Sequence, residues 1–132
     1  MTQEEKELLF KDLCSRLPYG VKVNTIYSNE HASFYRRRAC KNGVNELNLN
    51  IMWLYHVQFE IDIKPYLFPM SSMTEEQSKM YHELIGGMFG TSTLINFEAL
   101  EDFFHKNHID YRGLIEKGLA IEITNENNPY KE

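Results

Sequence analysis

The sequence predicts one α+β domain with an N-terminal helix, a four- to five-stranded antiparallel sheet and two or three short C-terminal helices. Three observations predict this fold: helical spacing of apolar residues near the N-terminus, alternating polarity in the middle, and helix-capping patterns beyond residue 70. The expected segments of the single domain 1–132 are a helix in 1–20, a sheet in 21–67, a helical part in 71–118, a closing strand in 119–123 and a frayed tail in 124–132. With 42% hydrophobic and 25% charged residues, the composition is globular and excludes a disordered, collagen-like or coiled-coil chain.

The first element is a helix predicted over about residues 3–16. Thr2 and Glu5 have the spacing of a capping box, in which each side chain accepts a hydrogen bond from the other residue's backbone N–H. Apolar residues follow at three- and four-residue steps: Leu9, Phe10, Leu13, Cys14 and Leu17. Pro18 and Gly20 end the helix, because proline has no N–H for the next turn.

The middle of the chain alternates in polarity and is rich in β-branched and aromatic residues, as half-buried strands are. The predicted strands are residues 21–27, 33–40, 47–51 and 57–63, with residues 52–56 joining or extending the last two. Asn42-Gly43 is a hairpin signal, since both residues tolerate a positive φ angle. Pro65 and Pro69 are expected to end the strands. A meander of this length fits an open sheet or a small curled barrel, and both alternatives stay open.

Capping signals predict the helices after residue 70. Hydroxyl side chains around Thr74 precede a helix at about residues 75–85, whose first-turn carboxylates complement the helix dipole. A third helix is expected around residues 97–104, with Asn96 as its N-cap.

Beyond the third helix, Asp110 is expected to cap a short turn that continues to residue 117. Gly118 is the expected left-handed terminator of that turn. Residues 119–123 then form the closing strand, and the polar tail 124–132 is expected to fray.

Charge and cysteine content narrow the class of protein. Lys and Arg number 14 against 19 Asp and Glu, a net charge of −5 that disfavours a general nucleic-acid coat. The N-terminus has no signal-peptide pattern, and no apolar run approaches the ~20 residues of a membrane span, so we expect a cytoplasmic protein. Cys14 and Cys40 are not in a Cys-x-x-Cys pair, which excludes a zinc ribbon and predicts free buried thiols.

One basic cluster is the best candidate for an anionic ligand. Arg36 and Arg38 would share one face of a strand, where guanidinium groups can bind phosphate oxygens. Trp53 and Tyr66 are candidate aromatic walls of the same site. The alternative is that the arginines form a solvated edge that discourages sheet aggregation.

A second, weaker candidate is a metal site at His105 and His108. Imidazoles three residues apart on a helix can bind one metal ion. The alternative needs no metal, since cations near a helix C-terminus are favoured by its dipole. Asp110 is expected to cap the following turn, so the sequence offers no third ligand for a metal ion. The sequence predicts no catalytic residue set and no cofactor.

Three segments carry a resemblance: Leu17–Val21, Ile63–Leu67 continuing into Pro69–Glu76, and Asp110–Ala120. Its most specific parts are Lys64-Pro65-Tyr66-Leu67, Ser71-Ser72-Met73-Thr74-Glu75-Glu76 and Asp110-Tyr111-Arg112-Gly113-Leu114. In these segments the chain resembles an uncharacterised family of short proteins found in phages and mobile elements of gut anaerobes. The resemblance implies a phage-like or mobile-element setting and no catalytic activity.

The leading hypothesis is therefore a non-enzymatic interaction protein that binds a host protein, or another host macromolecule, and modifies its activity. The first alternative is a sponge for a small anionic ligand such as a nucleotide signal, bound by the arginine and aromatic candidates. The second alternative is a metal-dependent hydrolase that uses the two histidines. The sequence leaves the partner and the oligomeric state open.

Overall fold

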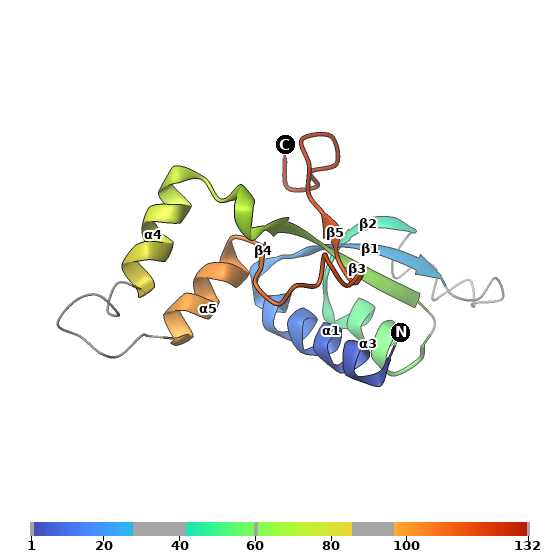
Figure 1. Cartoon of the computed structure of the whole chain (residues 1–132). Coiled ribbons are helices and arrows are strands. Elements are labelled where there is room, and N and C mark those ends of the chain that lie inside the picture. Colours follow the sequence, from blue (N-terminus) through green and yellow to red (C-terminus); the bar gives the residue numbers. More distant parts are fainter. Residues whose placement is uncertain (1, 28–41, 60, 86–96, 132) are drawn as a thin grey trace.

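Figure 1 shows a computed structural model of the chain, which describes residues 2–27, 42–59, 61–85 and 97–131. Its elements are α1 (Gln3–Arg16), η1 (Leu17–Tyr19), β1 (Lys22–Tyr27), β2 (Gly43–Glu46), α3 (Leu49–His56), β3 (Ile61–Pro69), η2 (Met70–Ser72), α4 (Glu75–Ile85), α5 (Phe97–Lys106), β4 (Ile109–Asp110) and β5 (Ile121–Glu122). The α+β prediction is confirmed, and so are the predicted helices at α1, α4 and α5. The predicted strand at 33–40, Cys40 and the Asn96 cap lie outside the described residues.

The sheet is mixed and open, which corrects the expectation of a purely antiparallel meander. Strand β1 lies between β2 and β3 and pairs with both in antiparallel register, with Val23 opposite Pro65 of β3. Strand β3 is longer than β1, and its last residues pair in parallel with β5 and β4. The described strands do not close into a barrel.

Residues 47–56 are the main error of the strand prediction, because most of this segment is helix α3. The Asn48 side chain caps the helix by accepting a hydrogen bond from the backbone N–H of Ile51 at 3.0 Å. Ile51, Met52 and Leu54 are then buried as one helical face. The alternating Leu-Asn-Leu-Asn-Ile pattern fits a strand equally well, so periodicity alone gave the wrong element.

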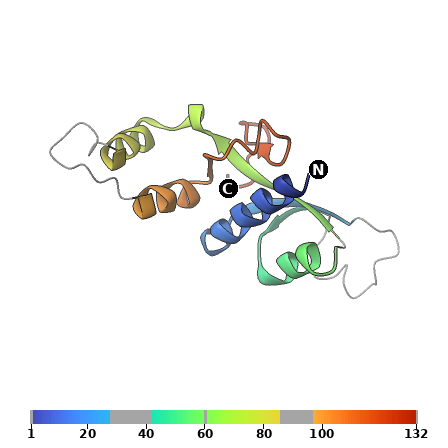
Figure 2. The same cartoon turned by 60° about the horizontal axis from the view of Figure 1, so that its bottom comes forward.

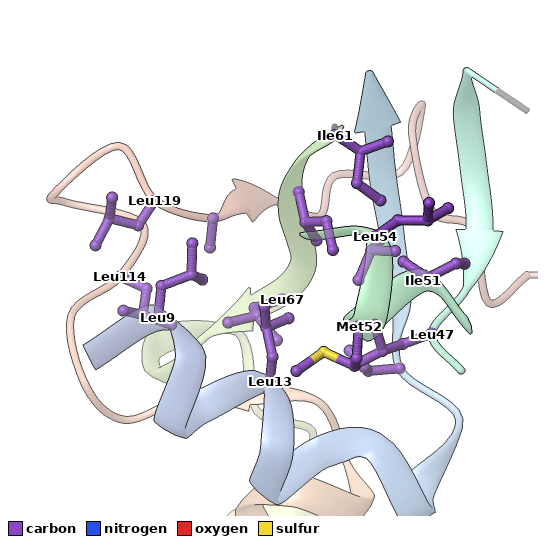
Figure 3. Close-up of a cluster of buried hydrophobic side chains, with 14 residues drawn as sticks. Leu9, Leu13, Leu47, Ile51, Met52, Leu54, Ile61, Leu67, Leu114 and Leu119 are labelled. Atoms are coloured by element: carbon purple, nitrogen blue, oxygen red, sulfur yellow. The ribbon is translucent and has the colours of Figure 1, made fainter. Parts of the chain in front are cut away.

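The core lies between the sheet and the two helices α1 and α3, which cover the same face of it (Figures 1 and 2). Figure 3 shows side chains from both helices meeting those of β3 and of the segment before β5. The labelled members are Leu9, Leu13, Leu47, Ile51, Met52, Leu54, Ile61, Leu67, Leu114 and Leu119. Helices α4 and α5 lie beyond the far end of β3 and share a smaller core around Phe103, Phe104 and Ile109.

The C-terminal tail was expected to fray, but Tyr130 anchors it to the sheet. Its hydroxyl accepts a hydrogen bond from the backbone N–H of Lys22 at 2.8 Å and donates one to the backbone oxygen of Tyr66 at 3.0 Å. Lys22 and Tyr66 would be the next opposite pair of β1 and β3. The Tyr130 hydroxyl therefore bridges the two strands where they diverge.

Pro65 lies inside β3 and does not end it, contrary to expectation. The backbone groups of Tyr66 point toward β1, and these groups alternate in direction along a strand. The missing N–H of Pro65 is therefore on the opposite side from β1, so the β1–β3 ladder loses no hydrogen bond.

Candidate functional site

A groove of about 760 Å³ opens between the first turns of α1, the end of α3 and the start of β3. Most of its surface is apolar. The lining residues are Gln3, Lys6, Glu7, Phe10, Asn24, Ile26, Tyr55, His56, Phe59, Ile61, Asp62, Ile63 and Lys64. The three elements pack against each other in the main core, so this packing fixes the positions of the groove walls.

One wall is a stacked aromatic pair that ties α1 to α3. The rings of Phe10 and His56 lie 3.9 Å apart between centroids, with 14° between their planes. Tyr55 beside them is half-buried, and burial raises the pKa of its hydroxyl. At pH 7 this wall therefore offers the groove a neutral phenol and two flat rings.

Phe59 forms the other rim in an unusual backbone conformation. It lies between α3 and β3 with a φ angle of 54°, in the left-handed region that glycine and asparagine tolerate best. Its side chain is 76% exposed, so folding buries little of the ring. Ile26 on β1 is 52% exposed and also lines the groove. Two large apolar side chains thus face solvent at one site.

The charged residues of the groove balance each other. Lys6 and Glu7 come from α1, and Asp62 and Lys64 come from the outer face of β3. Two cations therefore stand against two carboxylates, and this arrangement does not favour an anionic ligand. Groups of both signs around an apolar centre suit a peptide or protein surface better.

The predicted anion site lies only partly within the described residues. Arg36 and Arg38 lie outside them. Trp53 is 45% exposed on α3 and does not line the groove. Tyr66 is buried in β3, where its backbone oxygen accepts the Tyr130 hydroxyl. Neither residue lines the groove, and the anion site stays a prediction.

The two candidate metal ligands lie in different surroundings. His105 is buried, and its Nε2 lies 2.8 Å from the Tyr111 hydroxyl. His108 follows the end of α5 at a φ angle of 57°, and its ring stacks on Tyr130 at 4.1 Å. The helical spacing assumed for the pair is therefore not formed. Within the described segments, no group of three His, Cys, Asp or Glu side chains is placed to hold a metal ion.

Both histidines have lowered pKa values. Burial, together with the nearby charge of Arg16, lowers the pKa of His105. The same two causes lower the pKa of His108 to about 4. Both imidazoles are therefore mainly neutral at pH 7, which suits their packing against tyrosine rings.

Sequence reasoning missed a buried charge cluster, defined here as Asp12, Arg16 and Arg112. Arg16 and Asp12 are fully buried and paired at 2.8 Å. Arg112 lies 3.1 Å from the other Asp12 oxygen, without the alignment of a hydrogen bond. The cluster joins α1 to the segment after α5. Its only sequence signal was an acidic and a basic residue four positions apart on the otherwise apolar face of α1.

Cys14 was expected on that same buried face, but it is exposed. Asp12 and Arg16 occupy the buried positions instead. The chain therefore presents a free thiol on the outer side of α1, away from the charge cluster.

No protein-family model, curated protein or solved structure matches the chain. The resemblance to phage and mobile-element proteins therefore stays a prediction. No helix in the described part of the chain is long and apolar enough to cross a membrane. The groove beside Phe59 is the site that the geometry favours most.

Proposed function

We propose that the chain is a non-enzymatic interaction protein that binds another protein through the groove between α1 and β3. The observation that carries the proposal is Phe59, an aromatic residue that is 76% exposed in a left-handed conformation. Such a conformation costs a non-glycine residue about 1–3 kcal/mol. In the free protein the exposed ring buries too little surface to offset this cost. Burial of the ring against a partner would offset it, and this favours Phe59 as a binding residue.

The surroundings of Phe59 support a protein as the partner. Buried aromatic side chains dominate the binding energy of many interfaces, and a ring of polar groups excludes water around them. Here Phe59 and Ile26 supply apolar surface, while Lys6, Glu7 and Lys64 supply polar groups at the rim. The stacked wall behind them needs little ordering on binding, which lowers the entropic cost.

The resemblance to phage and mobile-element proteins, which implies a phage-like setting, supports a host protein as the partner. Binding would then change the activity of that protein by covering part of its surface. A small anionic ligand remains the alternative, and the test below separates the two classes of partner.

The experiment is a quantitative pull-down from host lysate with the full chain as bait. The groove variants Phe59→Asn and Ile26→Thr are compared with wild type, and Phe97→Ser is the control, since Phe97 is 66% exposed outside the groove. We expect one protein to be retained by wild type and by the control and lost from both groove variants. Native mass spectrometry of the bait detects a retained small anion.

Two results contradict the proposal. The first is equal retention of every captured protein by wild type and by both groove variants. The second is a bait that retains no protein and carries the added mass of an anion, which supports the ligand-binding alternative.

A further inference from the structure

We propose that the outer side of helix α3 is a self-association surface, on which a second copy of this chain packs in an antiparallel, two-fold arrangement. The surface is the α3 stripe, defined here as Leu49, Trp53 and Val57. None of these three residues lines the groove. Self-association is therefore a property additional to the proposed function.

The α3 stripe follows from the spacing of its residues. They are four positions apart, so they lie on one side of the helix, one turn after another. Leu49 begins the helix and Val57 is its C-cap. At ~1.5 Å per residue the stripe is about 12 Å long. The opposite side of α3 carries Ile51 and Leu54, which are buried in the main core.

All three side chains of the stripe are large, apolar and exposed to solvent. Leu49 is 74% exposed, Val57 is 54% exposed and Trp53 is 45% exposed. A helix on a protein surface normally carries polar residues on its outer side, and a helix that is apolar all round is normally covered all round. In Figure 2, α3 lies at the periphery of the fold. A second molecule on the stripe would complete the burial of this helix.

The stripe lies in a segment without charged side chains. Residues 47–59 contain no Asp, Glu, Lys or Arg, although these residues make up 25% of the chain. The cores of protein interfaces are depleted of charged residues and enriched in aromatic ones. The stripe therefore has the composition of an interface core, whereas the groove has charges of both signs along its walls.

A second copy of the chain is the occupant that this charge-free stripe favours. In a two-fold interface the same surface meets itself, so a charged residue near the axis would face a like charge. The stripe avoids this repulsion at all three positions. A membrane surface is disfavoured, because helices that lie on membranes carry Lys and Arg beside their apolar side, and this chain has a net charge of −5.

The order of the residues along the stripe fits an antiparallel pair of α3 helices. Trp53 is the middle residue, so the two-fold axis places it beside its own copy. Leu49 of each chain then meets Val57 of the other, because the two lie at equal distances on either side of Trp53. Three side chains cover less than the ~800 Å² per partner of a standard interface, so we expect a weak dimer that dissociates on dilution.

The test is sedimentation velocity of the full chain from about 1 μM to 1 mM, the range in which weak complexes dissociate. It compares wild type with two charge variants of the stripe. Leu49→Glu places an anion in the first turn of α3, and Val57→Lys places a cation at its C-terminal end, so both charges suit the helix dipole. Val44→Lys, at an exposed apolar residue of β2 outside the stripe, is the control.

We expect wild type and the control to form dimers as concentration rises. Each stripe variant alone should associate at least about tenfold more weakly, because its dimer would hold two unpaired charges in the interface. An equimolar mixture of Leu49→Glu and Val57→Lys should recover at least about tenfold stronger association than either variant alone. In the mixed dimer the introduced carboxylate meets the introduced ammonium, and the other contact keeps its leucine and valine.

Three sedimentation results overturn the inference. The first is a wild type that stays monomeric over the whole range, and the second is equal association of the control and both stripe variants. The third is a mixture that associates no more strongly than its components, which excludes the antiparallel contact of Leu49 with Val57.

The pull-down separates self-association from the proposed function. A host protein that is retained by a Leu49→Glu bait and lost from the groove variants supports two separate surfaces. Loss of that protein from the Leu49→Glu bait would mean that another protein covers the stripe, and it would overturn the second copy as the occupant. Dimers that respond to the stripe variants, with no host protein retained by any bait, would remove the proposed function alone.

Discussion

The guanidinium of Arg16 donates a hydrogen bond to the backbone oxygen of Ile109 at 2.6 Å, although the two residues are 93 positions apart. Arg16 is fully buried and also pairs with Asp12 one turn earlier in α1. It therefore fastens the N-terminal helix to β4, where the chain leaves α5 for the sheet. A guanidinium suits this place because its fork of N–H donors serves a carboxylate and a carbonyl together.

The first prediction is that Arg16→Met lowers the free energy of unfolding by about 3–5 kcal/mol. The substitution leaves Asp12 buried beside Arg112 alone and removes the donor of the Ile109 oxygen. Losing one partner of a buried ion pair has a cost of this size because the Asp12 oxygen and the Ile109 carbonyl that it served stay buried without a donor. Urea unfolding followed by circular dichroism measures the change.

Lys11→Met is the matched control for Arg16→Met, since it removes a cation from an exposed position of the same helix. It should change the free energy of unfolding by no more than about 0.5 kcal/mol. Equal effects of the two variants would show that the buried charge cluster does not stabilise the fold.

The second prediction is that Tyr130→Phe costs about 1–3 kcal/mol of unfolding free energy, although only an oxygen is removed. The Lys22 N–H and the Tyr66 oxygen both lose their partner, and an unmatched buried group keeps its full desolvation cost. The ring of the variant can still stack on His108, so the loss of unfolding free energy measures the contribution of the hydroxyl alone. Urea unfolding measures the difference, and Tyr19→Phe, whose hydroxyl bonds an exposed carboxylate, serves as control. A cost no greater than that of the control would contradict the bridging role.

The elements that were predicted correctly are those whose signals are local. The capping box of α1 forms as expected, with the Thr2 hydroxyl 3.1 Å from the Glu5 nitrogen. Asp110 accepts hydrogen bonds from the backbone N–H groups of Leu114 and Ile115, as a cap should. Gly118 has the expected positive φ angle. In each case the partners lie within a few residues, so the sequence contains the whole interaction.

The features that were missed depend on partners far apart in the sequence. Arg16 faces the core because carbonyl groups about 90 residues later meet it there. Tyr130 is anchored by strands more than 60 residues earlier, so a polar tail gave no sign of it. The groove joins α1, α3 and β3, and it depends on residues 49–56 being a helix, where the pattern predicted a strand. No local pattern contains these contacts.

The third prediction concerns stability in acid and His108. Its pKa is about 4 in the folded protein, and the ordinary value of 6.5 applies when it is unfolded. The unfolded chain therefore binds a proton that the folded chain rejects, and stability is lost as pH falls from about 6.5 toward 4. We expect the free energy of unfolding of His108→Asn to fall less steeply over this pH range, because asparagine cannot titrate. Asparagine also tolerates the φ angle of 57°.

Urea unfolding at several pH values between 7 and about 4.5 measures this dependence on both proteins. The variant is expected to be less stable at pH 7, since the ring no longer stacks on Tyr130. Part of the acid loss should remain, because burial also lowers the pKa of His105. His82→Asn, at an exposed position of α4, controls for the removal of a histidine. Parallel pH curves for wild type and His108→Asn would exclude the assigned role.

The last prediction separates folding from binding at Phe59. We expect Phe59→Asn to change the free energy of unfolding by less than about 1 kcal/mol, because asparagine relieves the left-handed strain and little buried surface is lost. The same variant should bind the partner captured by wild type at least about tenfold more weakly, as expected when an aromatic anchor is removed. Urea unfolding and fluorescence anisotropy measure the two effects on the same preparation. A large loss of stability would make Phe59 a core residue, and unchanged affinity would remove it from the interface. Unaltered folding with impaired binding is the combination expected of a residue whose strain is retained for contact with a partner.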